Sequence, residues 1–133
     1  PEGVSMEMAA FAEPLSVVLH TNSILGLRPD DTVLITGAGP MGLLHTMVTK
    51  LSGARVIISE VNEKRLKLAE KFGADVLLNP KEVDAPGKIK EITEGGADAA
   101  IVTIGNKDAI ESAINSIRSS GTVVIFASAY GHV

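Results

Sequence analysis

The sequence contains no cysteine and no tryptophan, and aromatic residues make up only 3% of its 133 positions. Without cysteine the chain has no disulfide bond and no thiolate ligand for a metal ion, which is compatible with a reducing cytoplasm. We therefore expect a cytoplasmic protein. Hydrophobic residues nevertheless account for 45% of the chain, so Val, Ile, Leu and Ala must build the interior. That composition is typical of a parallel β-sheet, whose strands are buried on both faces.

Positive charge is also scarce, since the formal net charge is −4. A nucleic acid or a membrane surface would require a basic face, so we expect neither as a partner. No apolar run approaches the length of a membrane span, and the beginning of the chain does not resemble a signal peptide. The length suits one domain. Because the sequence begins with Pro1 and stops in a loop-like segment, we expect a piece of a longer polypeptide.

The most informative segment is a G-x-G-x-x-G turn made by Gly37, Gly39 and Gly42. A strand-like run, 32–35, leads into this turn, and an amphipathic run, 41–51, leaves it as a predicted helix. In dinucleotide-binding folds the first glycine makes a tight turn and the second lets the backbone approach a pyrophosphate. The third lets the helix lie close to the sheet. The free N–H groups and the positive dipole end of that helix would face the phosphates.

An acidic residue follows the glycine turn at the distance that this fold requires. The segment 55–59 is predicted to be a second buried strand, and Glu60 stands at its C-terminal end. A carboxylate there would accept hydrogen bonds from the adenosine ribose hydroxyls and repel a 2′-phosphate, which favours NAD over NADP. The alternative is that Glu60 serves only as a first-turn acid of the following helix.

The rest of the chain continues the alternation of strands and helices. Further helices are predicted at 64–72, at 86–93 and from Asn106 onward, and further strands at 74–78, 99–103 and 121–127. Right-handed crossovers then give an α/β Rossmann fold, a doubly wound parallel sheet of strand order 3-2-1-4-5, with the nucleotide crevice between strands 1 and 4. The helix after Asn106 is expected to bury one apolar stripe, made of Ile110, Ala113, Ile114 and Ile117.

A helical segment is predicted ahead of the first strand. Ser5 is expected to cap a short helix, and Pro14 to occupy the first position of a second helix that runs to about Ile24. Glu13 thus stands at a helix start, where it would complement the helix dipole. We divide the chain into a helical connector, 1–30, and a nucleotide-binding domain, 31–133.

Two stretches, 9–17 and 26–42, resemble zinc-dependent medium-chain alcohol dehydrogenases, most closely the sorbitol (iditol) and threonine dehydrogenase branch. Later motifs at 65–66, 72–75, 97–98 and 121–124 agree. The resemblance implies the NAD-binding domain of an enzyme that transfers hydride from a secondary alcohol or polyol to NAD⁺. It also implies that the zinc ligands lie on a separate amino-terminal domain, so the isolated chain would bind cofactor but catalyse nothing. Members of the family form dimers or tetramers, so we expect a homo-oligomer.

The histidines give no reason to place a metal ion in this chain. His20, His45 and His132 lack the close spacing of zinc ligands and are expected to be ordinary surface or packing residues. The resemblance therefore implies zinc only in the complete enzyme.

The resemblance also implies roles for individual residues. The pyrophosphate turn corresponds to Gly37, Gly39, Pro40, Met41 and Gly42, the adenosine end to Glu60, Arg65, Thr103, Ile104 and Gly105, and the nicotinamide end to Phe126, Ala127 and Ser128. Ala127 departs from the glycine that the family often has, and Arg65 could equally be a solvated charge. Glu13 corresponds to a glutamate that approaches the catalytic zinc.

Three other interpretations remain open. A non-catalytic NAD-binding regulatory module would carry the same turn on the same fold. A methyltransferase that uses S-adenosylmethionine also places a glycine turn and an acid after consecutive strands, although seldom with a Gly-Pro-Met-Gly entry into the helix. A zinc-free quinone reductase relative would usually prefer NADP, which Glu60 opposes.

Overall fold

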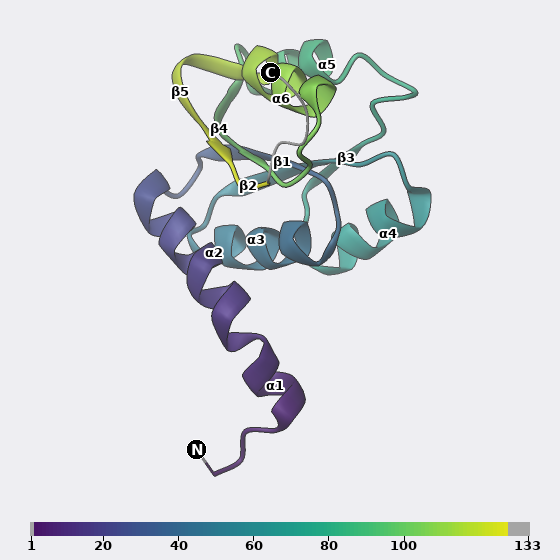
Figure 1. Ribbon diagram of the computed structural model, residues 1–133. Helices are drawn as coiled ribbons and strands as arrows, with labels where there is room; N and C mark the ends of the chain where they lie inside the picture. The colour runs from purple at the N-terminus through teal and green to yellow at the C-terminus, as the bar shows by residue number, and fades with distance from the viewer. Residues whose placement is uncertain (1, 128–133) are drawn as a thin grey trace.

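The structure is a computed structural model that describes residues 2–127. Within them, five parallel strands form one sheet of order β3-β2-β1-β4-β5, covered by helices on both faces (Figure 1). The strands are β1 (Thr32–Thr36), β2 (Arg55–Ser59), β3 (Val76–Leu78), β4 (Ala97–Val102) and β5 (Ile117–Ile125). The helices are α1 (Met6–Ala10), α2 (Ala12–Leu25), α3 (Pro40–Leu51), α4 (Glu63–Lys71), α5 (Ala85–Thr93) and α6 (Lys107–Ser116). The predicted Rossmann fold and its strand order are confirmed.

The central strand β1 determines where a crevice opens. It pairs with β2 on one side and with β4 on the other, so the chain winds outward from β1 in both directions. In Figure 1, α3 and α4 lie below the sheet and α5 and α6 above it. The connections that leave β1 and β4 therefore run to opposite faces of the sheet and diverge at the carboxyl ends of these two strands. Ligands bind at this place in open α/β sheets.

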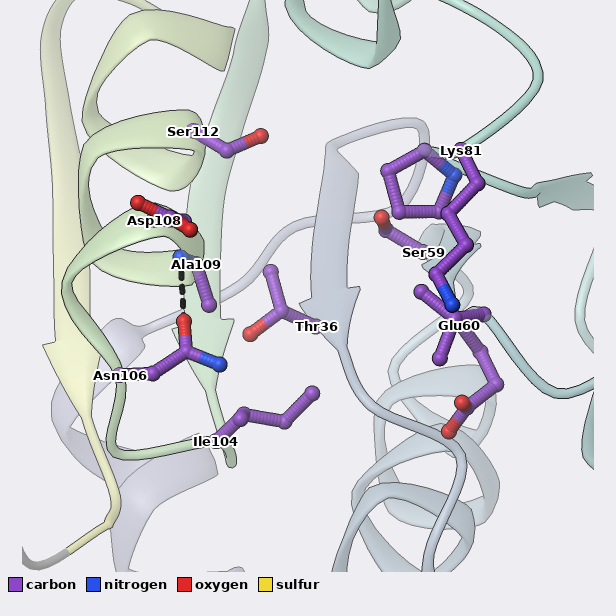
Figure 2. Close-up of a pocket in the computed structure, with 11 residues that line it drawn as sticks. Thr36, Ser59, Glu60, Lys81, Ile104, Asn106, Asp108, Ala109 and Ser112 are labelled. Carbon is purple, nitrogen blue, oxygen red and sulfur yellow. Dashed lines mark hydrogen bonds between the residues drawn. The ribbon is translucent and has the colours of Figure 1, made fainter.

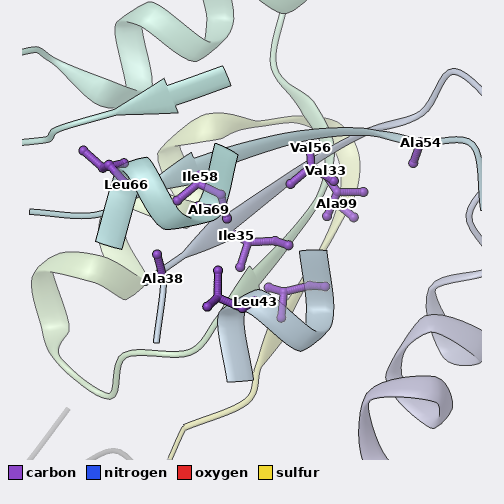
Figure 3. Close-up of a cluster of buried hydrophobic side chains, with 11 residues drawn as sticks. Val33, Ile35, Ala38, Leu43, Ala54, Val56, Ile58, Leu66, Ala69 and Ala99 are labelled. Atoms are coloured by element: carbon purple, nitrogen blue, oxygen red, sulfur yellow. The ribbon is translucent and has the colours of Figure 1, made fainter. Parts of the chain in front are cut away.

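Two hydrophobic clusters hold the helices to the sheet. Alternate residues of each strand point to opposite faces, so Val33 and Ile35 of β1 face α3 and α4, whereas Leu34 faces α5 and α6. All three are fully buried. The α3-side cluster adds Leu43 from α3 and Leu66 from α4, as Figure 3 shows. Burial on both faces explains why the inner strands are continuous runs of aliphatic residues.

The N-terminal helices attach to this core through α2. Val18 is fully buried, and the Asn22 side-chain amide donates to the Val48 carbonyl (3.2 Å) and to the Ser52 hydroxyl (3.1 Å) on the α3 side. By contrast, the described residues of α1 are all exposed, and α1 extends away from the sheet (Figure 1). The Ser5 hydroxyl accepts from the Met8 N–H, so the predicted cap is confirmed. The division of the chain at residue 30 stays a prediction.

Several predicted boundaries differ from the structure. The second helix begins at Ala12, so Pro14 occupies its third position and not its first. Pro14 fits there because the first turn of a helix leaves its N–H groups without intrahelical partners. Strand β3 is two residues shorter than predicted, and β5 starts directly after α6 with an irregular register that pairs Ala97 with Ile117 and then Ala99 with Thr122.

The predicted apolar stripe on α6 is wrong at Ile114, which is exposed, and at Ile117, which is the first residue of β5. Ala113 is fully buried, and Ile110 and Ile117 pack against the α5–α6 side of the core. Ile114, however, is 55% exposed. The helix ends at Ser116 and the chain continues directly into β5, so α6 contacts the sheet through fewer residues than a longer helix would. Within residues 2–127, no helix has the length and hydropathy that a bilayer crossing requires.

Candidate functional site

The turn after β1 requires glycine at its first position. Gly37 has a φ of +93°, in the left-handed region that L-residues with side chains rarely adopt. Its N–H donates to the Ser59 carbonyl at the end of β2 (2.8 Å). A Cβ atom here would lie 2.6 Å from the Thr103 hydroxyl oxygen and 2.9 Å from Ile104. The tight turn is thus enclosed by the segment that follows β4.

The third glycine is needed for the approach of helix α3 to the same turn. A Cβ atom on Gly42 would overlap the carbonyl oxygen of Gly37. Because that obstacle is main chain, no side-chain rotation could relieve the overlap. Gly42 therefore lets the first turn of α3 lie directly on the end of β1.

The second glycine differs from the other two. Gly39 has φ −75° and ψ −177°, which any residue adopts. A Cβ atom on it would meet nothing within 4 Å among the described residues. Gly39 is also the N-cap of α3, and no side chain of the described residues caps that helix. Folding alone does not explain this glycine, and the uncapped N–H groups of α3 border the open space beside it.

Glu60 is a buried carboxylate at the end of β2, with only 4% of its surface exposed. Its Oε2 accepts from the Ala38 N–H in the glycine turn, and its Oε1 accepts from the Asn62 N–H, both at 2.9 Å. Helix α4 starts at Glu63 with Asn62 as its N-cap. The alternative that Glu60 is the first-turn acid of that helix is therefore wrong, because Glu63 holds that position. Each Glu60 oxygen has a second lone pair available for a further donor.

A cavity of about 290 Å³ opens beside Glu60 at the carboxyl edge of the sheet. The ends of β1 and β2 and the segments after β2, β3 and β4 line it, and Figure 2 shows their side chains. The lining residues are Thr36, Ser59, Glu60, Val61, Pro80, Lys81, Ile104, Asn106, Asp108, Ala109 and Ser112. The Thr36 hydroxyl is buried and has no hydrogen-bond partner within the described part of the chain. A buried hydroxyl of this kind in a cavity wall is available to a ligand.

Most residues of this cavity were missed by sequence reasoning. Lys81, Asp108 and Ser112 belong to no short motif. The signal that could have found them is positional: they follow β3 or lie in the first turns of α6, and parallel sheets present such segments at one edge. Of the predicted adenosine contacts, Glu60 and Ile104 line the cavity. Arg65 has its guanidinium 3.8 Å from Glu60 Oε2 and is 58% exposed.

The other predicted site residues within the described part of the chain lie outside the cavity lining. The Thr103 hydroxyl donates to the Thr36 carbonyl (2.6 Å), so it supports the glycine turn, and Gly105 follows it outside the cavity lining. Phe126 and Ala127 follow β5, whereas Ser128 lies outside the described residues. Glu13 is an exposed residue in the first turn of α2.

His45, which the sequence led us to expect as an ordinary surface or packing residue, is a core residue. It lies on α3 and is fully buried, and neither ring nitrogen has a hydrogen-bond partner within residues 2–127. Its ring meets Phe126 edge to face, with centroids 4.6 Å apart and ring planes at 82°. Burial lowers the pKa of His45 to about 4, so the ring is neutral at pH 7. Across residues 2–127, no three His, Cys, Asp or Glu side chains gather closely enough to hold a metal ion.

Comparison with known proteins identifies the relatives of this fold and site. The family model described as "Zinc-binding dehydrogenase" matches residues 40–133. The chain belongs to the zinc-binding dehydrogenase family. It is 39% identical over 127 residues to a sorbitol dehydrogenase from Bacillus subtilis, covering 94% of this chain and 36% of the relative. It is 40% identical over 125 residues to an L-threonine 3-dehydrogenase from Pyrococcus furiosus, covering 92% and 36%.

Solved structures of zinc-binding dehydrogenases agree. An alcohol dehydrogenase from Thermus sp. ATN1 superposes with a TM-score of 0.91 at 27% identity, over 98% of this chain and 39% of that one. A zinc-binding dehydrogenase from Sinorhizobium meliloti, solved with NADP, superposes with a TM-score of 0.85 at 30% identity, over 93% and 38%. The chain thus spans little more than a third of the length of its relatives. The predicted family membership and its match to the coenzyme-binding domain are confirmed.

The buried histidine predicts a specific loss of stability in acid. In the unfolded chain His45 would protonate near pH 6.5, whereas in the folded chain it resists protonation down to about pH 4. The folded state is therefore favoured less and less as the pH falls between these values. We expect the free energy of unfolding to drop by about 2 kcal/mol between pH 7 and pH 4.5 from this residue. Urea unfolding at a series of pH values measures it.

The matched control is His45→Phe, which keeps an aromatic ring and removes the titration. Its unfolding free energy should change much less over the same pH interval. Equal slopes for the two proteins would show that His45 is not the group responsible.

Proposed function

We propose that this chain binds a nicotinamide dinucleotide, with NAD preferred, as the coenzyme-binding part of a zinc-dependent dehydrogenase. The enzyme would oxidise a secondary alcohol or a polyol in the cytoplasm. The observation that carries the proposal is the difference among the three glycines. Two are required by contacts inside the protein, and Gly39 between them faces open space at the uncapped start of α3.

The pyrophosphate fits that open space. The first N–H groups of α3, at Met41 and Gly42, have no intrahelical acceptors and lie at the positive end of the helix dipole. Pro40 occupies the first helical position, where its lack of an N–H removes no hydrogen bond. A side chain at position 39 would fill the volume that the phosphates need. The chain's own backbone would thus bind the phosphates with no basic side chain.

The adenosine half fits the cavity beside Glu60. The ribose hydroxyls would donate to the free lone pairs of the carboxylate, and the base would lie near Ile104. A 2′-phosphate would bring a second negative charge to within about 5 Å of Glu60, which costs roughly 3 kcal/mol at an effective dielectric constant of 20. This repulsion supports NAD over NADP for this chain, although a relative binds NADP. Arg65 is near enough to share the ribose end.

The other half of the dinucleotide would lie over the ends of β4 and β5. Gly105 follows β4 at that edge, and Phe126, Ala127 and Ser128 follow β5. We propose Phe126, Ala127 and Ser128 as contacts of the nicotinamide end, and Gly105, with Thr103 and Ile104, as part of the loop beneath the adenosine and its ribose. The methyl group of Ala127 leaves less room for the ring than a glycine would.

The cofactors define the reaction, and this chain orients one of them. When bound, a nicotinamide would supply the hydride acceptor, and a zinc ion in the complete enzyme would supply the Lewis acid that lowers the pKa of the alcohol. The described residues do not themselves provide a metal site. We propose that Glu13 lies near the zinc in the complete enzyme.

The names of the relatives point to a polyol or a hydroxy amino acid as substrate. The edge strand β5 would allow pairing in a dimer or tetramer.

The glycine turn supplies a matched pair of substitutions. Gly39→Ala should change the free energy of unfolding by less than about 1 kcal/mol, because its methyl group meets open space. It should still weaken NADH binding at least tenfold by occupying the phosphate volume. Gly42→Ala should cost about 3 kcal/mol of stability, because its methyl group meets main chain. Urea unfolding and NADH fluorescence titration measure both effects. A Gly39→Ala protein with wild-type affinity would place the phosphates elsewhere.

Glu60 supplies the second test. The wild-type chain should bind NADH about 100-fold more tightly than NADPH, the ratio that corresponds to roughly 3 kcal/mol. Glu60→Gln keeps the shape and removes the charge, so this ratio should fall at least tenfold. Glu60→Asp keeps the charge and is the control, with a preference for NADH that persists. An unchanged ratio in Glu60→Gln would contradict the role of the carboxylate.

A further inference from the structure

The contact between His45 and Phe126 connects two parts of the proposed dinucleotide site. His45 follows Gly42 by three residues on α3, the helix whose first turn faces the phosphates. Phe126 is the first residue after β5 and is not among the residues that line the adenosine cavity. The two rings meet edge to face at 4.6 Å. Such pairs contribute beyond the area that they bury and have a preferred geometry.

Phe126 is held at the carboxyl edge of the sheet through its main chain and through its side chain. The Phe126 N–H donates to the Val102 carbonyl at the end of β4 (2.8 Å), which anchors the residue at the carboxyl edge. Its side chain packs against the α3-side core. A doubly wound sheet places the second nucleotide at this edge.

Packing alone does not account for the choice of histidine at position 45. An aliphatic residue would fill the same fully buried volume without leaving two ring nitrogens unpaired within residues 2–127. What an aliphatic residue would lack is a flat ring that can meet the ring of Phe126 edge to face. The histidine is also fixed along α3, since the next residue, Thr46, is fully buried and its hydroxyl donates to the Gly42 carbonyl (2.8 Å).

We propose that His45 is a positioning residue that holds Phe126, and with it the main chain of 126–127, against the nicotinamide half of the cofactor. The helix that binds the phosphates would thereby also set the place of the second nucleotide. This inference rests on the proposed function.

The test compares two ligands that differ only at one end. ADP-ribose shares the adenosine, the pyrophosphate and the second ribose with NADH but lacks the nicotinamide ring. His45→Ala should weaken NADH binding about tenfold and change ADP-ribose binding by less than twofold. His45→Phe restores an aromatic edge and should bind both ligands within about twofold of wild type. Calorimetric titration of the whole chain measures all the affinities.

A second variant approaches the same contact from the other side. Phe126→Leu keeps an apolar side chain on a residue that is only partly buried, so the chain should fold even if His45→Ala does not. It should show the same selective loss of NADH affinity. The NADH emission spectrum of the bound ligand should also shift toward that of free NADH, because it reports the surroundings of the nicotinamide ring.

Four outcomes separate the possibilities. Selective loss of NADH affinity with rescue by His45→Phe supports the proposal. Equal loss of both ligands would show a general structural role and overturn it. Equal wild-type affinity for NADH and ADP-ribose would overturn it while leaving dinucleotide binding intact. Failure of the wild-type chain to bind either ligand would overturn the proposed function itself.

Discussion

The contact on which the rest of this structure depends is the close approach of helix α3 to the end of strand β1. The Gly37 carbonyl lies where any side chain at position 42 would have to be. This approach brings the start of a helix, with its unpaired N–H groups, to the carboxyl edge of a buried sheet. It also fixes the direction in which the chain leaves the sheet. A longer connection would hold the N–H groups at the start of α3 less rigidly and leave them hydrogen-bonded to water.

The buried carboxylate of Glu60 is the second constraint, and it depends on the first. A charge that is 96% buried needs donors, and the main-chain N–H groups of Ala38 and Asn62 provide them. One of these donors belongs to the glycine turn and the other to the cap of α4. Glu60 therefore connects the turn, β2 and α4. The same side chain lines the cavity, so in the function that we propose one residue serves both the structure and the choice of cofactor.

The sequence was sufficient for those parts of the fold that depend on local chemistry. The spacing of Gly37, Gly39 and Gly42, and the place of Glu60 at a strand end, follow from backbone geometry that few other residues satisfy. Strand order followed from the handedness of crossovers, which is nearly universal. The start of α6 depends on the Asn106 side chain, which caps its own helix, so local sequence indicates it well.

What the sequence could not supply depends on tertiary contact. The exposure of Ile114 and the early start of α2 reflect how far a helix rests on its neighbours, which periodicity does not encode. His45 and Phe126 are in contact although they lie 81 residues apart in the sequence, and no motif connects the two positions. Lys81 and Asp108 come to one cavity only because their parallel strands end at the same edge.

The most direct test of this account is to map the amide resonances of the ¹⁵N-labelled chain while NAD⁺ is added. We expect the largest shifts at Gly39, Met41 and Gly42, a second group around Glu60, and little change at Arg118 to Gly121 near the opposite edge of the sheet. Shifts that are absent from the glycine turn at saturating NAD⁺, or that gather at the opposite edge, would contradict the claim that the start of α3 binds the phosphates.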